Sequence, residues 1–171
     1  MTTLIAWTSR DQRRFAALHV ATDSRISWGS SMHRWDAGRK TFASRTTPDV
    51  LAYSGDVVFP ALVLSQLMSA ADAGLLFAKE SSAQGRHTIL LDALRSSFQR
   101  RHNAPDRSFA ILHASRDGEK AAGQPRLWQT SFDQKTSTWK DEQVEIEEKA
   151  GIAAVNGSGS VALKKEACLS G

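Results

Sequence analysis

The spacing of hydrophobic residues changes along the chain. Near the start, β-branched and apolar residues at 2–8 and 15–22 flank a polar stretch, which predicts a hairpin. Such a hairpin would hold the first residues inside a sheet and keep them from fraying. Shorter extended segments, separated by Ser, Gly, Asp and Pro, predict further strands at 25–28, 40–43 and 50–54.

A helical period replaces this pattern from Val57 onward. Apolar residues recur there at intervals of three and four up to Ala71, which predicts one face of an α-helix. A second helix, packed on the first, is predicted from His87 to Arg101, with a loop around 79–85 between them. The extended pattern then returns and predicts strands at 109–114, 126–132, 138–144 and 152–155, with a further helix beginning at Val161.

The order of these elements defines the fold class. Strands come first, then two helices, then strands again, which predicts an α+β fold whose helices are segregated from antiparallel strands. The chain of 171 residues suits one domain, and we find no repeat, low-complexity tract or linker in it. We therefore expect residues 1–171 to form a single domain.

Composition excludes several classes of protein. The net charge of +4, from 22 basic and 18 acidic residues, is too small to imply nucleic-acid binding. The single cysteine, Cys168, excludes an intrachain disulfide and is interpreted as a small buried apolar residue. We see no signal peptide and no apolar run long enough to cross a membrane, so we expect a cytoplasmic protein without membrane contact.

Three polar features in the first forty residues are candidates for chemistry. They are Thr2 at the start, Asp23 after an apolar strand, and Lys40 before a short strand. Each has a simpler interpretation, because Thr is a common strand residue, Asp is common in turns, and Lys is usually a solvated charge. Their value as candidates depends on the surrounding motifs.

Those motifs resemble the proteasome β-subunit family, with its bacterial ring-forming relatives HslV and Anbu. The resemblance lies in five segments in the family's order: Thr2-Thr3-Leu4-Ile5-Ala6, Ala21-Thr22-Asp23-Ser24-Arg25-Ile26-Ser27, Gly38-Arg39-Lys40-Thr41-Phe42, Leu51-Ala52-Tyr53-Ser54-Gly55-Asp56 and Gly157-Ser158-Gly159. It implies the four-layer αββα sandwich of N-terminal-nucleophile hydrolases. Because family members continue beyond the last motif, we expect this chain to lack their C-terminal portion.

The resemblance assigns the central catalytic roles. Thr2, exposed by removal of Met1, would be the nucleophile, and its own α-amine, with a pKa near 8, would be the base. Lys40 would sit beside the Thr2 hydroxyl and stabilise its deprotonated form. Asp23 would pair with Lys40, because an isolated buried ammonium is costly.

Four further residues are expected around the nucleophile. By the same resemblance, Ser27 and Gly55 would align an extended peptide through backbone groups. Tyr53 would line the first specificity pocket, although it could equally be a strand residue that packs in the core. Ser158 would share the hydrogen-bond network of Thr2, and it could also serve as a turn or helix-cap residue.

We expect no metal or cofactor. The five histidines show no metal-ligand spacing and are interpreted as surface or packing residues. The run of glycine and serine at 157–160 lacks the Lys-Ser/Thr ending of a phosphate-binding loop.

The resulting hypothesis is a threonine-type peptidase built from identical subunits in a ring. It would cleave peptides or unfolded proteins, with an ATPase unfoldase as a possible partner. Two alternatives stay open: a non-catalytic structural ring subunit, and an amidohydrolase that acts on a small amide, since a fold does not fix its substrate.

Overall fold

The computed structural model describes residues 3–11, 15–28, 33–77, 82–102, 105, 107–118, 123–147 and 149–160. Ten strands and one pair of helices, near the middle of the chain, form the described residues. The elements follow in the order β1 (Leu4–Arg10), β2 (Phe15–Thr22), β3 (Ile26–Ser27), β4 (Arg34–Trp35), β5 (Thr41–Ala43), β6 (Val50–Gly55), α1 (Val58–Asp72), α2 (Ala83–Gln99), β7 (Phe109–Asp117), β8 (Gln124–Asp133), β9 (Thr138–Val144) and β10 (Gly151–Asn156).

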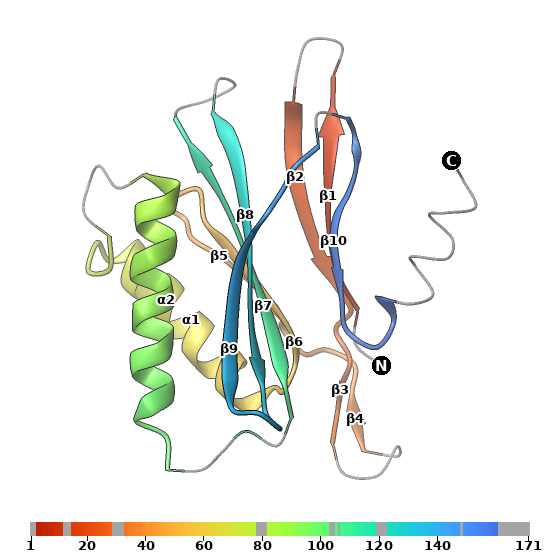
Figure 1. The fold of residues 1–171 in the computed structure, drawn as a ribbon, viewed down its shortest axis with the longest axis vertical. Helices are drawn as coiled ribbons and strands as arrows, with labels where there is room; N and C mark the ends of the chain where they lie inside the picture. The colour runs from red at the N-terminus through yellow and green to blue at the C-terminus, as the bar shows by residue number, and fades with distance from the viewer. Residues whose placement is uncertain are drawn as a thin grey trace.

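Three layers can be followed in Figure 1. Both helices cover one face of a five-stranded sheet of order β5-β6-β7-β8-β9, and a three-stranded sheet of order β10-β1-β2 lies on the other side. A small hairpin, β3-β4, projects beyond one end of these layers. The strand pairs are antiparallel, so the predicted α+β class is confirmed.

Two hydrophobic cores hold the layers together, and alternation along the strands separates them. In β6, Leu51 and Tyr53 face the helices, whereas Ala52 between them faces the three-stranded sheet. The helix-facing core contains buried aromatic and aliphatic side chains, among them Phe42, Tyr53, Phe59, Leu64, Leu90, Phe109 and Phe132. The inter-sheet core consists of Leu4, Ala6, Ala52, Leu112, Ala114, Leu127 and Ala154.

The second helix begins four residues earlier than the sequence pattern predicts. Ser82 caps it, because the Ser82 hydroxyl accepts a hydrogen bond from the Gly85 backbone N–H at 3.0 Å. The Asp117 carboxylate accepts a second one from the Ala83 N–H at 2.6 Å. These caps satisfy donors at the helix start, so Gly85 lies inside α2 and not in the predicted loop.

The described residues form three layers, and the predicted four-layer sandwich stays a prediction. Within the described residues, no helix covers the outer face of β10-β1-β2. The helix predicted from Val161 also falls outside those residues. No helix in the described part of the chain is both long and apolar enough to span a membrane.

Candidate functional site

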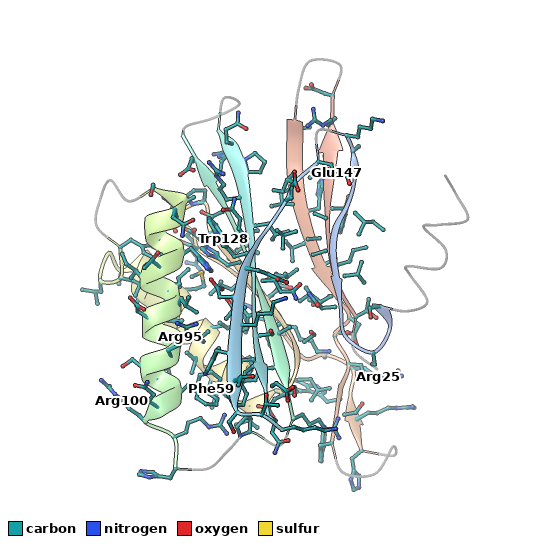
Figure 2. The ribbon with its side chains drawn as sticks, in the orientation of Figure 1. Arg25, Phe59, Arg95, Arg100, Trp128 and Glu147 are labelled. Carbon is teal, nitrogen blue, oxygen red and sulfur yellow. The ribbon has the colours of Figure 1, made fainter. Side chains whose placement is uncertain are left out.

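A buried lysine lies where the two sheets and the hairpin meet. Lys40 immediately precedes β5, and its side chain is only 1% exposed. Its ammonium donates hydrogen bonds to the Asp23 carboxylate at 3.2 Å and to the backbone carbonyl of Arg25. Arg25 is labelled in Figure 2 at the base of the hairpin. A buried charge is stable only when paired, and these two acceptors meet that need.

A close backbone contact brings Lys40 to this position. The Gly38 N–H donates to the Ser24 carbonyl at 2.9 Å, so the segment before β5 runs against the segment before β3. A Cβ atom at Gly38 would meet Ile26 Cδ1 at 2.3 Å, which is closer than real contacts allow. It would also lie 3.0 Å from the Ser24 carbonyl oxygen, so glycine favours this close approach of the two segments.

Asp23 connects Lys40 to the start of β1. Besides the ammonium, its Oδ1 atom accepts a hydrogen bond from the Thr3 N–H at 2.7 Å. In return, the Asp23 N–H donates to the Thr3 carbonyl at 3.1 Å. One carboxylate thus fixes the lysine charge next to the backbone of the third residue in the chain.

The Gly-Ser-Gly turn packs against the same residue. β10 pairs with β1 with Asn156 opposite Leu4, so the turn after β10 reaches Thr3. Gly157 has a φ of 93°, which favours glycine, and its carbonyl accepts a bond from the Ser160 N–H at 3.1 Å. A Cβ atom at Gly159 would lie 2.2 Å from Thr3 Oγ1, so a larger residue here would press on the Thr3 side chain.

The structure thus gathers three sequence-predicted features at one point. Asp23, Lys40 and the turn that carries Ser158 all border Thr3, and the Ser158 side chain is exposed. Thr2 itself lies outside the described residues.

The predicted substrate-aligning residues belong to two different strands. Ser27 is in β3, two residues beyond the Arg25 carbonyl that accepts from Lys40. Gly55 ends β6 with a φ of 97°, and a Cβ atom there would meet the Ser108 carbonyl oxygen at 2.3 Å. Its geometry therefore has a structural reason independent of any substrate.

Tyr53 has its backbone near the site and its ring away from it. The Tyr53 N–H donates to the Lys40 carbonyl at 3.1 Å. The ring is fully buried in the helix-facing core, where it stacks on Phe42 with centroids 6.5 Å apart. Burial, with the negative charge of Asp56, raises the Tyr53 pKa to about 12, and its hydroxyl contacts no hydrogen-bond partner among the described residues. Core packing alone accounts for this side chain.

A groove of about 350 Å³ opens beside the Gly-Ser-Gly turn. Its walls come from β6, β7 and β8 on one side and from Asn156 and Gly157 on the other. The Asn156 side-chain amide donates to Gln129 Oε1 at 2.9 Å and so links the two sheets across it. We did not predict Asn156 or Gln129 as site residues; Asn156 adjoins a recognised motif, whereas nothing near Gln129 in the sequence marks it.

Metal-binding chemistry finds no support in the described residues. None of their His, Cys, Asp and Glu side chains form a group of three or more that could hold a metal ion. The chain matches no protein-family model, and it matches no curated protein sequence.

Proposed function

We propose that this protein is a threonine-type peptidase of the proteasome β-subunit kind, with Thr2 as an N-terminal nucleophile. One observation carries the proposal. Asp23 binds both the buried Lys40 ammonium and the backbone N–H of Thr3, so the carboxylate that holds this positive charge also holds the residue that follows Thr2 in the sequence.

The bonding of Lys40 suits such a role. Two of its three ammonium hydrogens go to Asp23 and to the Arg25 carbonyl, and the third is donated to none of the described residues. A spare donor on a buried cation favours a neighbouring oxyanion or alkoxide. Lys40 is therefore proposed to stabilise the deprotonated Thr2 hydroxyl.

The reaction follows from these groups. The Thr2 α-amine accepts the hydroxyl proton as the oxygen attacks a peptide carbonyl carbon, and the leaving amine then takes up that proton. Water hydrolyses the resulting ester and frees Thr2. The groove beside Gly157 would take the substrate as an extended peptide along the backbones of Ser27 and Gly55, with Ser158 beside the nucleophile.

The assembly belongs to the same proposal. We propose that residues 1–171 act as one domain, that the three described layers are part of a four-layer αββα sandwich, and that identical subunits form a ring in the cytoplasm. An unfolded polypeptide is the proposed substrate, delivered by an ATPase unfoldase. No metal or cofactor takes part in this scheme.

Intact mass after incubation with a peptide epoxyketone tests the proposal, because this inhibitor needs both the hydroxyl and the free amine of Thr2. We expect a product without Met1 that gains the full inhibitor mass. Thr2→Ser, which keeps both groups, should still react, whereas Thr2→Ala should not.

Other outcomes would point to the alternatives. Retained Met1, or an adduct that survives in Thr2→Ala, contradicts the proposed nucleophile. A folded protein with a Thr2 terminus and no adduct would favour a structural ring subunit. An adduct without peptide cleavage would favour an amidohydrolase for small amides.

A further inference from the structure

The groove beside the Gly-Ser-Gly turn lies where the facing surfaces of the two sheets change from apolar to polar. Alternation along β6, β7 and β8 points three rows of aligned residues toward the three-stranded sheet, which lies opposite them in Figure 1. The rows are Val50, Ala114 and Leu127, then Ala52, Leu112 and Gln129, then Ser54, Ala110 and Ser131. The inter-sheet core ends at the second row, and the third row borders the groove.

The third row leaves space between the sheets because its side chains are small. Leucines fill this space in the first two rows, at Leu127 and Leu112. Two serines and an alanine cannot do so, and the gap opens to solvent as the groove of about 350 Å³. A groove of this volume is large enough to take part of a bound peptide.

Four polar groups along the groove have hydrogen-bonding capacity that no described residue uses. Ser54 is only 3% exposed, and its hydroxyl, like that of Ser131, makes no hydrogen bond to a described residue. The bond from Asn156 to Gln129 uses one N–H of the first amide and the oxygen of the second. One NH₂ group and one amide oxygen of this pair therefore remain, and they would remain if both amides were turned over.

Charge is scarce along the groove. Asp133 is the one charged side chain among the described residues that line it, and its Oδ1 atom accepts a hydrogen bond from the Lys135 N–H at 2.8 Å. An apolar group bound beside Ser54 would cover hydroxyls and an amide pair without giving them partners, which costs binding free energy. A carboxamide offers two N–H donors and one acceptor, so it matches the neutral donors and acceptors present.

We propose that this groove binds the carboxamide side chain of a glutamine or asparagine in the substrate. The proposal rests on the proposed function for one point, that the substrate is a peptide. Ser54 and Ser131 bind the carboxamide on the five-stranded sheet, and the Gln129 and Asn156 pair binds it from between the two sheets. The site thus selects a neutral polar side chain beside the candidate nucleophile.

Peptide binding to the full chain carrying Thr2→Ala tests this without turnover. The probes are acetylated Ala-X-Ala tripeptides with a dimethylamide at the C-terminus, where X is Gln, Met or Lys. Met matches Gln in length but has no amide, and Lys tests whether Asp133 selects a cation instead. The readout is the position of the side-chain NH₂ signals of Gln129 and Asn156 in ¹⁵N–¹H correlation spectra.

The Gln peptide should move both NH₂ signals. We expect it to half-saturate the shift at a concentration roughly tenfold lower than the Met and Lys peptides need, which is the effect of about one net hydrogen bond. Equal affinity for the Gln and Met peptides, tighter binding of the Lys peptide, or no movement of either signal would overturn the proposal.

A pair of double variants tests the groove residues themselves. Ser54→Ala with Ser131→Ala removes two hydroxyls that bind no described residue, so the fold should persist while the preference for Gln over Met falls. The control is Ser65→Ala with Ser96→Ala, at exposed serines of α1 and α2 on the other face of the sheet, and it should keep the full preference. The same preference in both double variants would also contradict the proposal.

The proposed function would fail by a different result. A Thr2-dependent epoxyketone adduct in a protein without the Gln preference would leave the nucleophile in place and remove the groove as its specificity site. Selective binding of the Gln peptide without any adduct would keep the groove as a peptide-binding site and remove Thr2 as the nucleophile.

Discussion

Two buried clusters of charged side chains in this protein differ in how many of their hydrogen-bond donors have partners. Around Asp49, Arg86 donates to Asp49, Ser115 and the Arg116 carbonyl, and His113 fills the other oxygen of Asp49. Around Lys40, one donor of a 1% exposed ammonium goes to none of the described residues. A cluster whose buried charges pair with one another stabilises a fold, whereas a buried charge with an unused hydrogen-bond donor can bind a further group.

The largest expected effect is on stability, at the cluster around Asp49 and Arg86. Asp49→Ala leaves the Arg86 guanidinium buried without its carboxylate, and such a break costs roughly 3–5 kcal/mol. Chemical denaturation measures the loss. Asp36→Ala removes an exposed ion pair with Arg25 and should change the unfolding midpoint little. Equal losses of stability in Asp49→Ala and Asp36→Ala would contradict the larger role of the buried pair.

The next largest effect is on the reactivity of the protein with the epoxyketone, at Lys40. Lys40→Met keeps the length of the side chain and removes its charge, so the rate of epoxyketone addition should fall by roughly 10²–10³. The fold should survive, because Asp23 is 30% exposed and keeps its bond from Thr3. Lys140→Met, at a side chain that is 71% exposed, is the control. An unchanged rate in Lys40→Met would remove Lys40 from the mechanism.

A smaller effect is expected where the Gly-Ser-Gly turn touches Thr3. Gly159→Ala would place a methyl group 2.2 Å from Thr3 Oγ1, and overpacking of this kind costs roughly 1–3 kcal/mol. Adduct formation should slow as well. Gly151→Ala, also in this C-terminal segment, meets no atom within 4 Å and should be neutral.

A double variant sharpens that result. Thr3→Ala removes the oxygen that the new methyl group would strike, so Gly159→Ala should cost less in its presence. Thermal or denaturant unfolding of the four proteins gives the coupling free energy. Additive losses would mean that the two residues do not press on each other.

The smallest effect at neutral pH is expected at Tyr53. Tyr53→Phe removes a buried hydroxyl that has no partner among the described residues, so stability should change by less than about 1 kcal/mol. Above pH 10 the stability of the wild-type protein should fall below that of Tyr53→Phe. An unfolded tyrosine ionises near pH 10, whereas burial raises the folded pKa to about 12, so the wild-type protein loses stability over that interval and the variant does not.

Absorbance at 295 nm checks the cause directly. The chain has a single tyrosine, so phenolate absorbance reports Tyr53 alone. Ionisation of the folded protein near pH 10 would show that the ring is accessible, as a residue of an open specificity pocket would be.

Much of the fold could be predicted because its elements have regular apolar periods. The strand at 138–144 was predicted with its true bounds, and the first helix within one residue at each end. The hairpin strand β4 was not predicted, because a strand of two exposed residues leaves no period to detect. The early start of α2 is supported by the local cap Ser82 and by Asp117, which lies 34 residues from the Ala83 N–H it binds.

The polar clusters show more clearly which contacts the sequence alone cannot predict. Asp23 and Lys40 could be proposed as partners because they stand in recognisable motifs 17 residues apart. His113 and Asp49 are 64 residues apart, and His87 and Asp141 are 54 apart, in stretches without a motif. Nothing local distinguishes such histidines from surface ones, because their role comes only from the strands and helix that bring them together.

The central place of β1 in its sheet affects when this sheet can form during synthesis. β1 is the central strand of β10-β1-β2, and its second partner, β10, ends at Asn156. A ribosome that adds about 5–20 residues per second needs roughly 10–30 s to make that partner after β1 has emerged. During that time one edge of the first strand has no native neighbour. The sheet on which the candidate site depends therefore closes only after β10 has been made.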